Sequence, residues 1–297
     1  MMITLHLIQQ KYRDTLRSYY SEDEIRTMVH ILLEEYLGVT HTQLLLMSSD
    51  ALLDSRVEQR LNVALRRLLS QEPIQYILGH APFGDLDLKV ASGVLIPRPE
   101  TEELCAMIVE QQSGRSPLRI LDLGTGSGCI ALYLADKLPQ AQLFALEKNE
   151  APVRVAQSNF SQYAGVGCAP QLIQGDMLCG ASWVDQLPPL DIIVSNPPYI
   201  QPKESVSMEP HVLDHEPFDA LFAPEEDPLL FYRAILDLID QIPLSSTPSP
   251  LIYLELNALL AQETLALYLT HPRIHSAQLH PDLSGKMRFL TATIQSL

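Results

Sequence analysis

The sequence has few cysteines, and they are not arranged to bind a metal or to form a disulfide framework. The four are Cys105, Cys129, Cys168 and Cys179, and they make no CxxC pair and no cluster with histidine. This usage excludes a disulfide-stapled scaffold and a zinc-ribbon type of site. It is typical of free thiols in a reducing compartment, so we expect a cytoplasmic protein without a metal centre.

Long apolar runs are lacking as well. No stretch approaches the roughly 20 apolar residues that a transmembrane helix needs. The N-terminal sequence MMITLHLIQQKYRD also lacks the basic segment and the small-residue cleavage site of a secretory signal peptide. We therefore expect no membrane segment and no signal peptide.

Basic residues are scarce. The chain has 20 Lys and Arg against 36 Asp and Glu, which gives a formal net charge of −16 over 297 residues. A protein that grips duplex nucleic acid gains most of its affinity by neutralising phosphates, so this charge disfavours stable nucleic-acid binding. A basic protein partner or a small substrate fits the charge better.

The first part of the chain has the pattern of a small helical domain, which we expect over residues 1–75. In SEDEIRTMVHILLEEYLG, Ser21 and Glu24 form a capping box and Gly38 supplies the C-terminal stop. A second amphipathic helix is expected from about Asp50 to Leu69. The pattern leaves two roles open for this domain, which are packing alone and the docking of a partner.

Residues 76–100 are expected to form a β-hairpin linker, because FGDLDLKVASGVLIP alternates apolar and polar residues around Ser92 and Gly93. Strand and helix patterns then alternate over residues 101–297, which predicts an α/β domain with a mostly parallel sheet covered on both faces. The expected strands are RILDL, QLFALE, PQLIQ, LDIIVS, LIYLEL and MRFLTATI, and helices are expected at CIALYLADKL and APVRVAQSNF.

A glycine-rich turn follows the first of these strands. In LDLGTGSGCIAL, Gly124, Gly126 and Gly128 remove side chains where a ligand must approach the backbone. The GxGxG spacing differs from the dinucleotide fingerprint and from a P-loop, and a tight turn without a ligand is the alternative. Glu147 ends the next strand, where a carboxylate can accept hydrogen bonds from two ribose hydroxyls.

The third strand supports a nucleoside ligand. LIQGDM ends with Asp176, a candidate for the edge of an adenine, and with Met177, which can pack on the ring. The order D-x-G-x-G-x-G, then an acid, then Gly-Asp, resembles class I S-adenosylmethionine-dependent methyltransferases. The resemblance implies a Rossmann-like fold and S-adenosylmethionine as cofactor.

The fourth strand delivers SNPPYI to the same edge of the sheet. An amide or aromatic amino group is a poor nucleophile because its lone pair is delocalised. The Asn196 side-chain carbonyl and the Pro197 backbone carbonyl can each accept one of its N–H bonds, which orients the nitrogen toward the methyl group and stabilises its growing positive charge. Pro198 stiffens the turn, and Tyr199 offers a flat face to a planar group.

Further segments resemble one family, the release factor glutamine methyltransferases. These are EPIQYILG, FGDLDLKVASGVLIPRPETEEL, LDLGTGSGCIAL, SNPPYI, HEPFDAL and DLSGKMRF, in that order from about Glu72 onward. The resemblance implies methylation of the side-chain amide nitrogen of the glutamine in the Gly-Gly-Gln motif of peptide chain release factors. It also implies a helical domain joined by a β-hairpin to the methyltransferase domain.

The resemblance assigns roles to individual residues. The catalytic residues it implies are Asn196, Pro197 and Tyr199, and Pro198 joins them in binding substrate. The cofactor-binding residues it implies are Gly124, Thr125, Gly126, Ser127, Gly128, Glu147, Asp176, Met177 and Asn196. Arg98 and Glu100 lie in the most distinctive block and either line the mouth of the site or form an ion pair.

The chain departs from the family pattern at two positions. Glu147 stands where an Asp is commoner, which changes little because both accept two hydrogen bonds. Asn257 in YLELN stands where the family usually has a glycine, so we expect a changed loop there.

Two other functions account for part of the pattern. An adenine amino-methyltransferase of DNA or rRNA explains SNPPYI and the cofactor motif equally well, but it predicts a basic groove and, for duplex, base extrusion. The net charge argues against it. A non-catalytic cofactor-binding scaffold is the other alternative, and the intact glycines, Glu147 and Asn196 argue against it.

Overall fold

The computed structural model describes residues 3–115, 117–165, 167–179, 182–246 and 248–295. The chain forms two compact units. One consists of Met1–Gly79 and Glu209–His215, and the other of His80–Met208 and Glu216–Leu297. The hairpin segment therefore belongs to the second unit, and seven residues from the middle of the chain belong to the first. Over the described ranges, no helix is long and apolar enough to cross a membrane.

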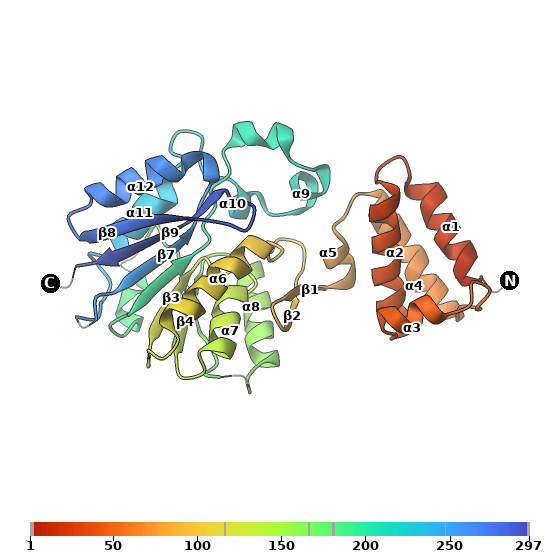
Figure 1. Ribbon diagram of the computed structural model, residues 1–297, viewed down its shortest axis with the longest axis horizontal. Helices are drawn as coiled ribbons and strands as arrows, with labels where there is room; N and C mark the ends of the chain where they lie inside the picture. The colour runs from red at the N-terminus through yellow and green to blue at the C-terminus, as the bar shows by residue number, and fades with distance from the viewer. Residues whose placement is uncertain (1–2, 116, 166, 180–181, 247, 296–297) are drawn as a thin grey trace. The chain divides into compact units, whose positions relative to one another are not determined.

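The first unit is helical (Figure 1). Its helices are α1 (Leu5–Leu16), α2 (Glu22–Leu37), α3 (His41–Leu46), α4 (Ser55–Leu69), α5 (Ile74–Leu78) and α9 (Pro210–His215). The predicted capping box at Ser21 and Glu24 is confirmed, and Gly38 ends α2 in the left-handed conformation. Fully buried side chains such as Ile8 and Leu32 form its core.

Helix α4 begins five residues later than the sequence predicts. Asp54 caps it by accepting a hydrogen bond from the backbone N–H of Arg56, and Leu52 pairs with Thr4 in an isolated β-bridge. The apolar residues at 51–53 are therefore extended and not helical, and Leu53 packs in the core of the unit. A capping side chain placed inside the predicted helix is the local signal that marks the true start.

The hairpin consists of β1 (His80–Phe83) and β2 (Leu86–Lys89), paired antiparallel. Its turn lies at Gly84 and Asp85, where Gly84 has a φ of +56°, and not at Ser92 and Gly93 as the sequence predicts. Ser92 and Gly93 lie in a separate turn after β2, closed by a hydrogen bond from the Val94 N–H to the Ala91 carbonyl.

The second unit is built on a seven-stranded sheet in the order β5-β4-β3-β6-β7-β9-β8. The strands are β3 (Arg119–Leu123), β4 (Gln142–Glu147), β5 (Gln171–Gln174), β6 (Ile192–Ser195), β7 (Leu251–Glu255), β8 (Ile274–Pro281) and β9 (Met287–Ile294). Strands β3 to β7 run parallel, whereas β9 runs antiparallel to β7 and to β8. The predicted α/β fold with a covered parallel sheet is confirmed.

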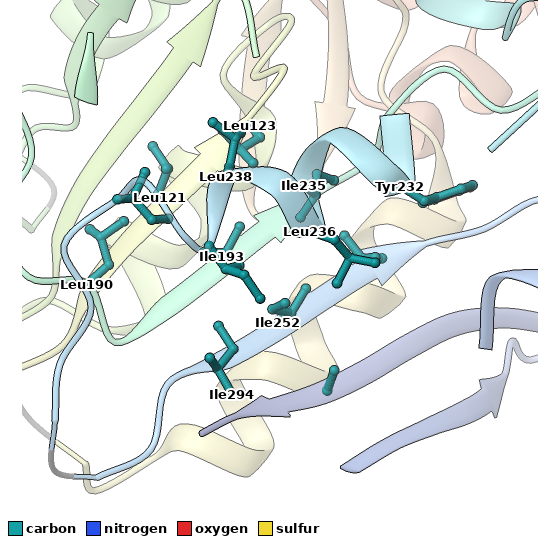
Figure 2. Packing of buried hydrophobic residues seen from close by; sticks show 14 of the residues in the cluster. Leu121, Leu123, Leu190, Ile193, Tyr232, Ile235, Leu236, Leu238, Ile252 and Ile294 are labelled. Atoms are coloured by element: carbon teal, nitrogen blue, oxygen red, sulfur yellow. The ribbon is translucent and has the colours of Figure 1, made fainter. Parts of the chain in front are cut away.

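Helices cover both faces of this sheet (Figure 1). Helices α6 (Pro99–Gln112), α7 (Cys129–Lys137) and α8 (Glu150–Gln162) cover one face, and α11 (Leu230–Leu238) and α12 (Ala261–Thr270) cover the other. Alternate residues of β3 and β6 face the two cores: Ile120 and Ile192 pack toward α6 and α7, whereas Leu121 and Ile193 pack toward α11. Figure 2 shows Ile235 and Leu238 of α11 beside these strand side chains.

The strand order reverses between β3 and β6. After β3 the chain moves to β4 and β5 on one side, and after β6 it moves to β7 on the other. Leu123, the last residue of β3, pairs with Ser195, the last of β6, and the Ser195 hydroxyl donates to the Leu123 carbonyl at 2.7 Å. Ligands of open α/β sheets bind at such a switch point, beyond the carboxyl ends of the strands.

Candidate active site

A cavity of about 610 Å³ opens at this switch point. Its volume is that of a pocket for a small ligand, which is typically about 300–1,000 Å³. Of the residues predicted for the site, it is lined by Gly124, Thr125, Gly126, Ser127, Glu147, Asp176, Met177, Asn196, Pro198 and Arg98. Gly128, Pro197, Tyr199 and Glu100 do not line it.

The glycine turn, residues Gly124–Gly128, joins β3 to α7. The N–H groups of Gly124 and Thr125 both donate to the Leu146 carbonyl at 2.9 Å, which ties the turn to the end of β4. All three glycines have positive φ, between +58° and +84°. A Cβ at Gly126 would meet nothing within 4 Å, so this residue leaves open space beside the backbone.

Gly128 serves packing and does not face the cavity. A Cβ built there would lie 2.5 Å from Cε1 of Phe160 in α8. The third glycine is therefore required by the contact between α7 and α8 as well as by its φ of +84°. Its predicted place among the cofactor contacts stays a prediction.

Asp122 lies under the glycine turn and is fully buried. The Thr125 hydroxyl donates to its Oδ2 at 2.5 Å. Burial raises the pKa of Asp122 to about 7, and the charge of Glu147 adds to the shift while the Thr125 hydrogen bond opposes it. The turn thus rests on a carboxyl group that titrates near neutral pH.

Glu147 closes the turn from the end of β4. Its Oε2 accepts the Gly126 N–H at 3.0 Å, and its Oε1 accepts the N–H groups of Lys148 and Asn149, both at 2.9 Å. A carboxylate offers about four acceptor positions, so three backbone donors leave it capacity for one more. Glu147 therefore organises the backbone of two loops and still faces the cavity, where a hydroxyl can reach it.

Asp176 and Met177 follow β5 on the neighbouring strand. Asp176 accepts the Leu178 N–H at 2.9 Å and pairs with the Lys148 ammonium at 2.9 Å. Burial works to raise the pKa of Asp176, but the Lys148 ammonium and the Leu178 N–H outweigh it and lower the pKa. The Met177 methyl lies 3.3 Å from the position that a Cβ on Gly124 would take.

These residues fit S-adenosylmethionine. Open backbone at Gly126, a partly free carboxylate at Glu147 and an apolar wall that includes Met177 and Leu178 suit an adenosine with a sulfonium side chain. A side chain at Gly124 would press on Met177 and narrow the cavity.

The acceptor turn, residues Asn196–Tyr199, follows β6 on the other side of the switch point. Asn196 lines the cavity, and its Nδ2 donates to the Thr101 Oγ1 at 2.9 Å. Thr101 in turn donates to Glu255 Oε2 at 2.7 Å, and the Tyr199 hydroxyl donates to Glu255 Oε1 at 2.8 Å. The turn is thereby joined to α6 and to the end of β7.

Tyr199 points its hydroxyl away from the cavity, toward this buried carboxylate. Its side chain packs against the hydrophobic core on the α11 face. Burial, and then the charge of Glu255, raise the pKa of Tyr199 well above its usual value. Its predicted contact with a planar substrate group stays a prediction, as does the role of the buried Pro197.

Arg98 lines the cavity and pairs with Glu216, whose Oε1 lies 2.5 Å from the Arg98 Nη2. Glu216 Oε2 also accepts the Ile96 N–H at 3.1 Å. Both of the roles that the sequence leaves open for Arg98, cavity lining and an ion pair, are therefore present. Glu100 lies in the first turn of α6 and does not line the cavity.

Asn257 replaces the usual glycine with a set of hydrogen bonds. Its Nδ2 donates to the Tyr199 carbonyl at 3.0 Å and to Glu204 Oε1 at 2.7 Å, and its Oδ1 accepts the Leu259 N–H. The expected change in this loop is thus an added clamp on the back of the acceptor turn.

The sequence does not point to several residues of this site. Thr101 and Glu255 are nearly completely buried and carry no motif of their own, although Thr101 lies in the block IPRPETEEL. The segment around α10 (Phe218–Leu221) also lines the cavity, with Phe218 and Phe222 stacked 4.6 Å apart. HEPFDAL is the sequence signal that marks this segment.

Comparisons with known proteins agree with the geometry. Two family models match the chain: PrmC N-terminal domain over residues 8–79 and methyltransferase small domain over residues 101–213. The release factor glutamine methyltransferase of Bacteroides thetaiotaomicron is 37% identical over 282 residues, which are 94% of this chain and 96% of that protein. The release factor glutamine methyltransferase of Flavobacterium psychrophilum is 35% identical over 285 residues, 94% of this chain and 95% of that protein.

Among solved structures, the human Mettl16 catalytic domain in complex with the MAT2A 3′UTR hairpin 6 has a TM-score of 0.51. It is 16% identical, and the match covers 82% of this chain and 83% of that one. At this identity the likeness shows the fold alone.

Proposed function

The chain belongs to the release factor glutamine methyltransferase family, and from that premise we propose that it methylates the glutamine of the Gly-Gly-Gln motif in peptide chain release factors. It is an S-adenosylmethionine-dependent protein-glutamine methyltransferase. The observation that supports this proposal is the position of Asn196 at the wall of the cavity, directly after β6, which pairs with β3, the strand that leads into the glycine turn.

The cofactor half of the site is the glycine turn with Glu147, Asp176 and Met177. S-adenosylmethionine supplies an electrophilic methyl group on a sulfonium. We propose that Gly126 lets it approach the backbone, that Glu147 accepts a ribose hydroxyl, and that Asp176 and Met177 meet the adenine. Glu147 is already fixed by three backbone N–H groups, so it needs little reorganisation to bind.

The acceptor half is Asn196 with Pro197. The Asn196 Oδ1 and the Pro197 carbonyl each accept one N–H of the glutamine amide, so the nitrogen presents its lone pair to the methyl group. The two carbonyl oxygens would also stabilise the positive charge that grows on the glutamine nitrogen as it takes up the methyl group. The methylated amide is strongly acidic, and it loses its extra proton to water or a nearby carbonyl without a dedicated base.

The partner is a protein and not a nucleic acid. A net charge of −16 repels a polyanion over most of the surface. A substrate that works in translation places the reaction in the cytoplasm.

The test is a labelled methyl-transfer assay. Purified enzyme receives a release factor, the same factor with the motif glutamine changed to alanine, and matched DNA and rRNA fragments. We expect label only in the unchanged factor. Label in nucleic acid, or equal label in both factors, would reject the proposal.

We also propose that residues 1–75 dock the release factor. Arg56 and Arg66 of α4 are exposed cations on a chain that is otherwise acidic, and either can meet a carboxylate of the factor. In the variant R56E/R66E, we expect KM for the intact factor to rise several-fold while methylation of a short Gly-Gly-Gln peptide keeps its rate. An unchanged KM for the factor would show that Arg56 and Arg66 do not take part in docking.

A further inference from the structure

The reaction needs the oxygen of the Asn196 amide, and not its nitrogen, to face the acceptor. The two ends of a primary amide are nearly the same in size, so sterics alone do not select one orientation. An amide turned the wrong way would present two N–H donors to the N–H donors of the substrate. Some other part of the protein must therefore set the orientation.

Glu255 is the start of a chain of hydrogen bonds with a fixed direction. Its side chain ends β7 and is 1% exposed. Burial raises the pKa of Glu255, and the Thr101 and Tyr199 hydroxyls and the charge of Arg288 oppose that rise. The groups that face its two oxygens are hydroxyl donors, so the geometry makes the carboxylate an acceptor. An ionised carboxylate only accepts hydrogen bonds. Both of its oxygens do so, from Thr101 at 2.7 Å and from Tyr199 at 2.8 Å.

Thr101 links Glu255 to Asn196 and fixes which atom of the Asn196 amide donates. A hydroxyl has a single proton, and the Thr101 proton is committed to Glu255. Its oxygen can therefore only accept from Asn196, which selects Nδ2 as the atom at 2.9 Å from Thr101. The Asn196 Oδ1 takes part in no hydrogen bond with any residue that the structure describes. It is left as the acceptor on the cavity side.

The same carboxylate holds the other end of the acceptor turn. Tyr199 bonds directly to Glu255, so the first and last residues of Asn196–Tyr199 are tied to one buried group from two directions. A shift of Glu255 would move both ends together. The two prolines between them have fixed φ angles, so the backbone of the turn has little freedom to change its conformation.

We propose that Thr101 and Glu255 are positioning residues for methyl transfer, which act by holding the Asn196 amide with its oxygen toward the glutamine nitrogen. This inference rests on the role given to Asn196 under the proposed function. Neither residue touches the reacting atoms. Their effect falls on turnover, since misorientation of a single polar group at the reacting centre costs rate far more than binding.

The decisive pair of variants is Thr101→Val and Thr101→Ser. Valine keeps the shape of threonine and removes the hydroxyl, so no acceptor remains there to hold the Asn196 Nδ2 and fix the orientation of the amide. We expect kcat to fall at least about tenfold, with the KM for release factor and the calorimetric affinity for S-adenosylmethionine changed less than about threefold. Serine restores the hydroxyl and is expected to restore kcat to within about twofold of wild type.

The matched control is Thr264→Val. Thr264 of α12 is also fully buried, and its hydroxyl donates at 2.9 Å to the carbonyl of Leu260, the residue just before this helix, away from the cavity. This variant reports what the loss of a buried threonine hydroxyl costs in stability, and we expect its kcat to be unchanged. A kcat for Thr101→Val within twofold of wild type, or equal losses for the valine and serine variants, would overturn the proposal.

A double-variant cycle tests whether Glu255 acts through Thr101. If the two form one chain, Thr101→Val combined with Glu255→Gln loses no more kcat than the more damaged single variant. Losses that multiply would overturn the proposed chain. Asn196→Ala is assayed in parallel: if that variant keeps its turnover on release factor, the orienting role given to Asn196 under the proposed function fails, whereas if only the Thr101 variants keep theirs, this inference alone fails.

Discussion

The glycine turn and the acceptor turn face each other across the switch point, but they are built in opposite ways. The glycine turn is made of backbone, and its supporting contacts join residues between Asp122 and Asn149. The acceptor turn is held through the side chains of Asn196 and Tyr199, and its supports lie 95 residues away at Thr101 and 56 residues away at Glu255. The difference shows that a site for binding can be assembled locally, whereas a site for orientation depends on the finished sheet.

The two halves should therefore fail differently. Substitutions in the glycine turn are expected to lower both cofactor affinity and stability, because the turn is hydrogen-bonded to the end of β4. Damage to the acceptor turn is expected to strike turnover and leave the cofactor bound. Five substitutions test this contrast.

The largest effect is expected from Asn196→Ala. It removes one of the two acceptors for the glutamine amide, so kcat should fall by more than about a hundredfold. Calorimetry should find the affinity for S-adenosylmethionine within a few-fold of wild type, and Asn62→Ala in the helical unit serves as the control. Near-normal turnover with the cofactor bound would show that the acceptor turn does not orient the substrate.

The next effect is on stability and comes from Gly128→Ala. The added Cβ would lie 2.5 Å from the Phe160 ring at a φ of +84°, so urea unfolding should show a loss of about 2 kcal/mol or more. Gly126→Ala has the same backbone penalty with open space, and its loss should be about 1 kcal/mol. Equal losses would mean that the contact between α7 and α8 is not what requires glycine at position 128.

Asp122→Asn tests the carboxyl group beneath the glycine turn through pH. Its pKa is raised in the folded protein from 3.8 to about 7. The folded state therefore holds the proton more tightly, and the stability due to this group is present below about pH 4 and is lost as the pH rises through about 7.

The amide of the Asp122→Asn variant cannot titrate, so that protein lacks this loss. Relative to the variant, the wild-type free energy of unfolding should fall by about 1.4 kcal/mol between pH 6 and pH 8, the span around the raised pKa. Urea unfolding of both proteins at several pH values measures the difference. A difference that stays constant across this range would contradict the raised pKa.

The smallest effect is expected from Asn257→Gly, which installs the residue usual in the family. The change removes hydrogen bonds to the Tyr199 carbonyl and to Glu204, so unfolding should lose about 1 kcal/mol. Because the oxygen of Asn196 is held from the other side, kcat should change less than twofold. A large loss of kcat would show that the acceptor turn is oriented from its back and not through Thr101.

Much of the fold can be predicted from the sequence because its signals are local. The apolar runs RILDL and QLFALE are β3 and β4 to the residue. Strand β8 escapes prediction because it lies at the edge of the sheet, and most of its side chains are exposed or half-buried. Ile274, Ala277 and Leu279 of β8 pack against the core, but they are too few and too widely spaced to give the apolar run that marks a buried strand.

The site divides in the same way. Gly124, Gly126 and Glu147 are close in sequence and belong to one recognisable motif, so they can be predicted. The roles of Thr101 and Glu255 cannot be predicted from sequence. The two residues are 154 positions apart, and only the folded sheet brings their oxygens to 2.7 Å. The hairpin turn at Gly84 escapes for a simpler reason: two glycine turns are possible, and pairing of the flanking strands selects the first.

The membership of Glu209–His215 in the helical unit has a topological consequence. The chain passes between the units three times, after Gly79, after Met208 and after His215. A chain cut before His80 would keep α9 and lose its partners, among them the Ser70 carbonyl that lies 2.7 Å from His215 Nε2. The very next residue, Glu216, holds Arg98 at the cavity wall. The helical unit therefore includes a segment that leads directly into a residue bonded to the cavity wall, and removing residues 1–79 would leave that segment without the rest of its unit.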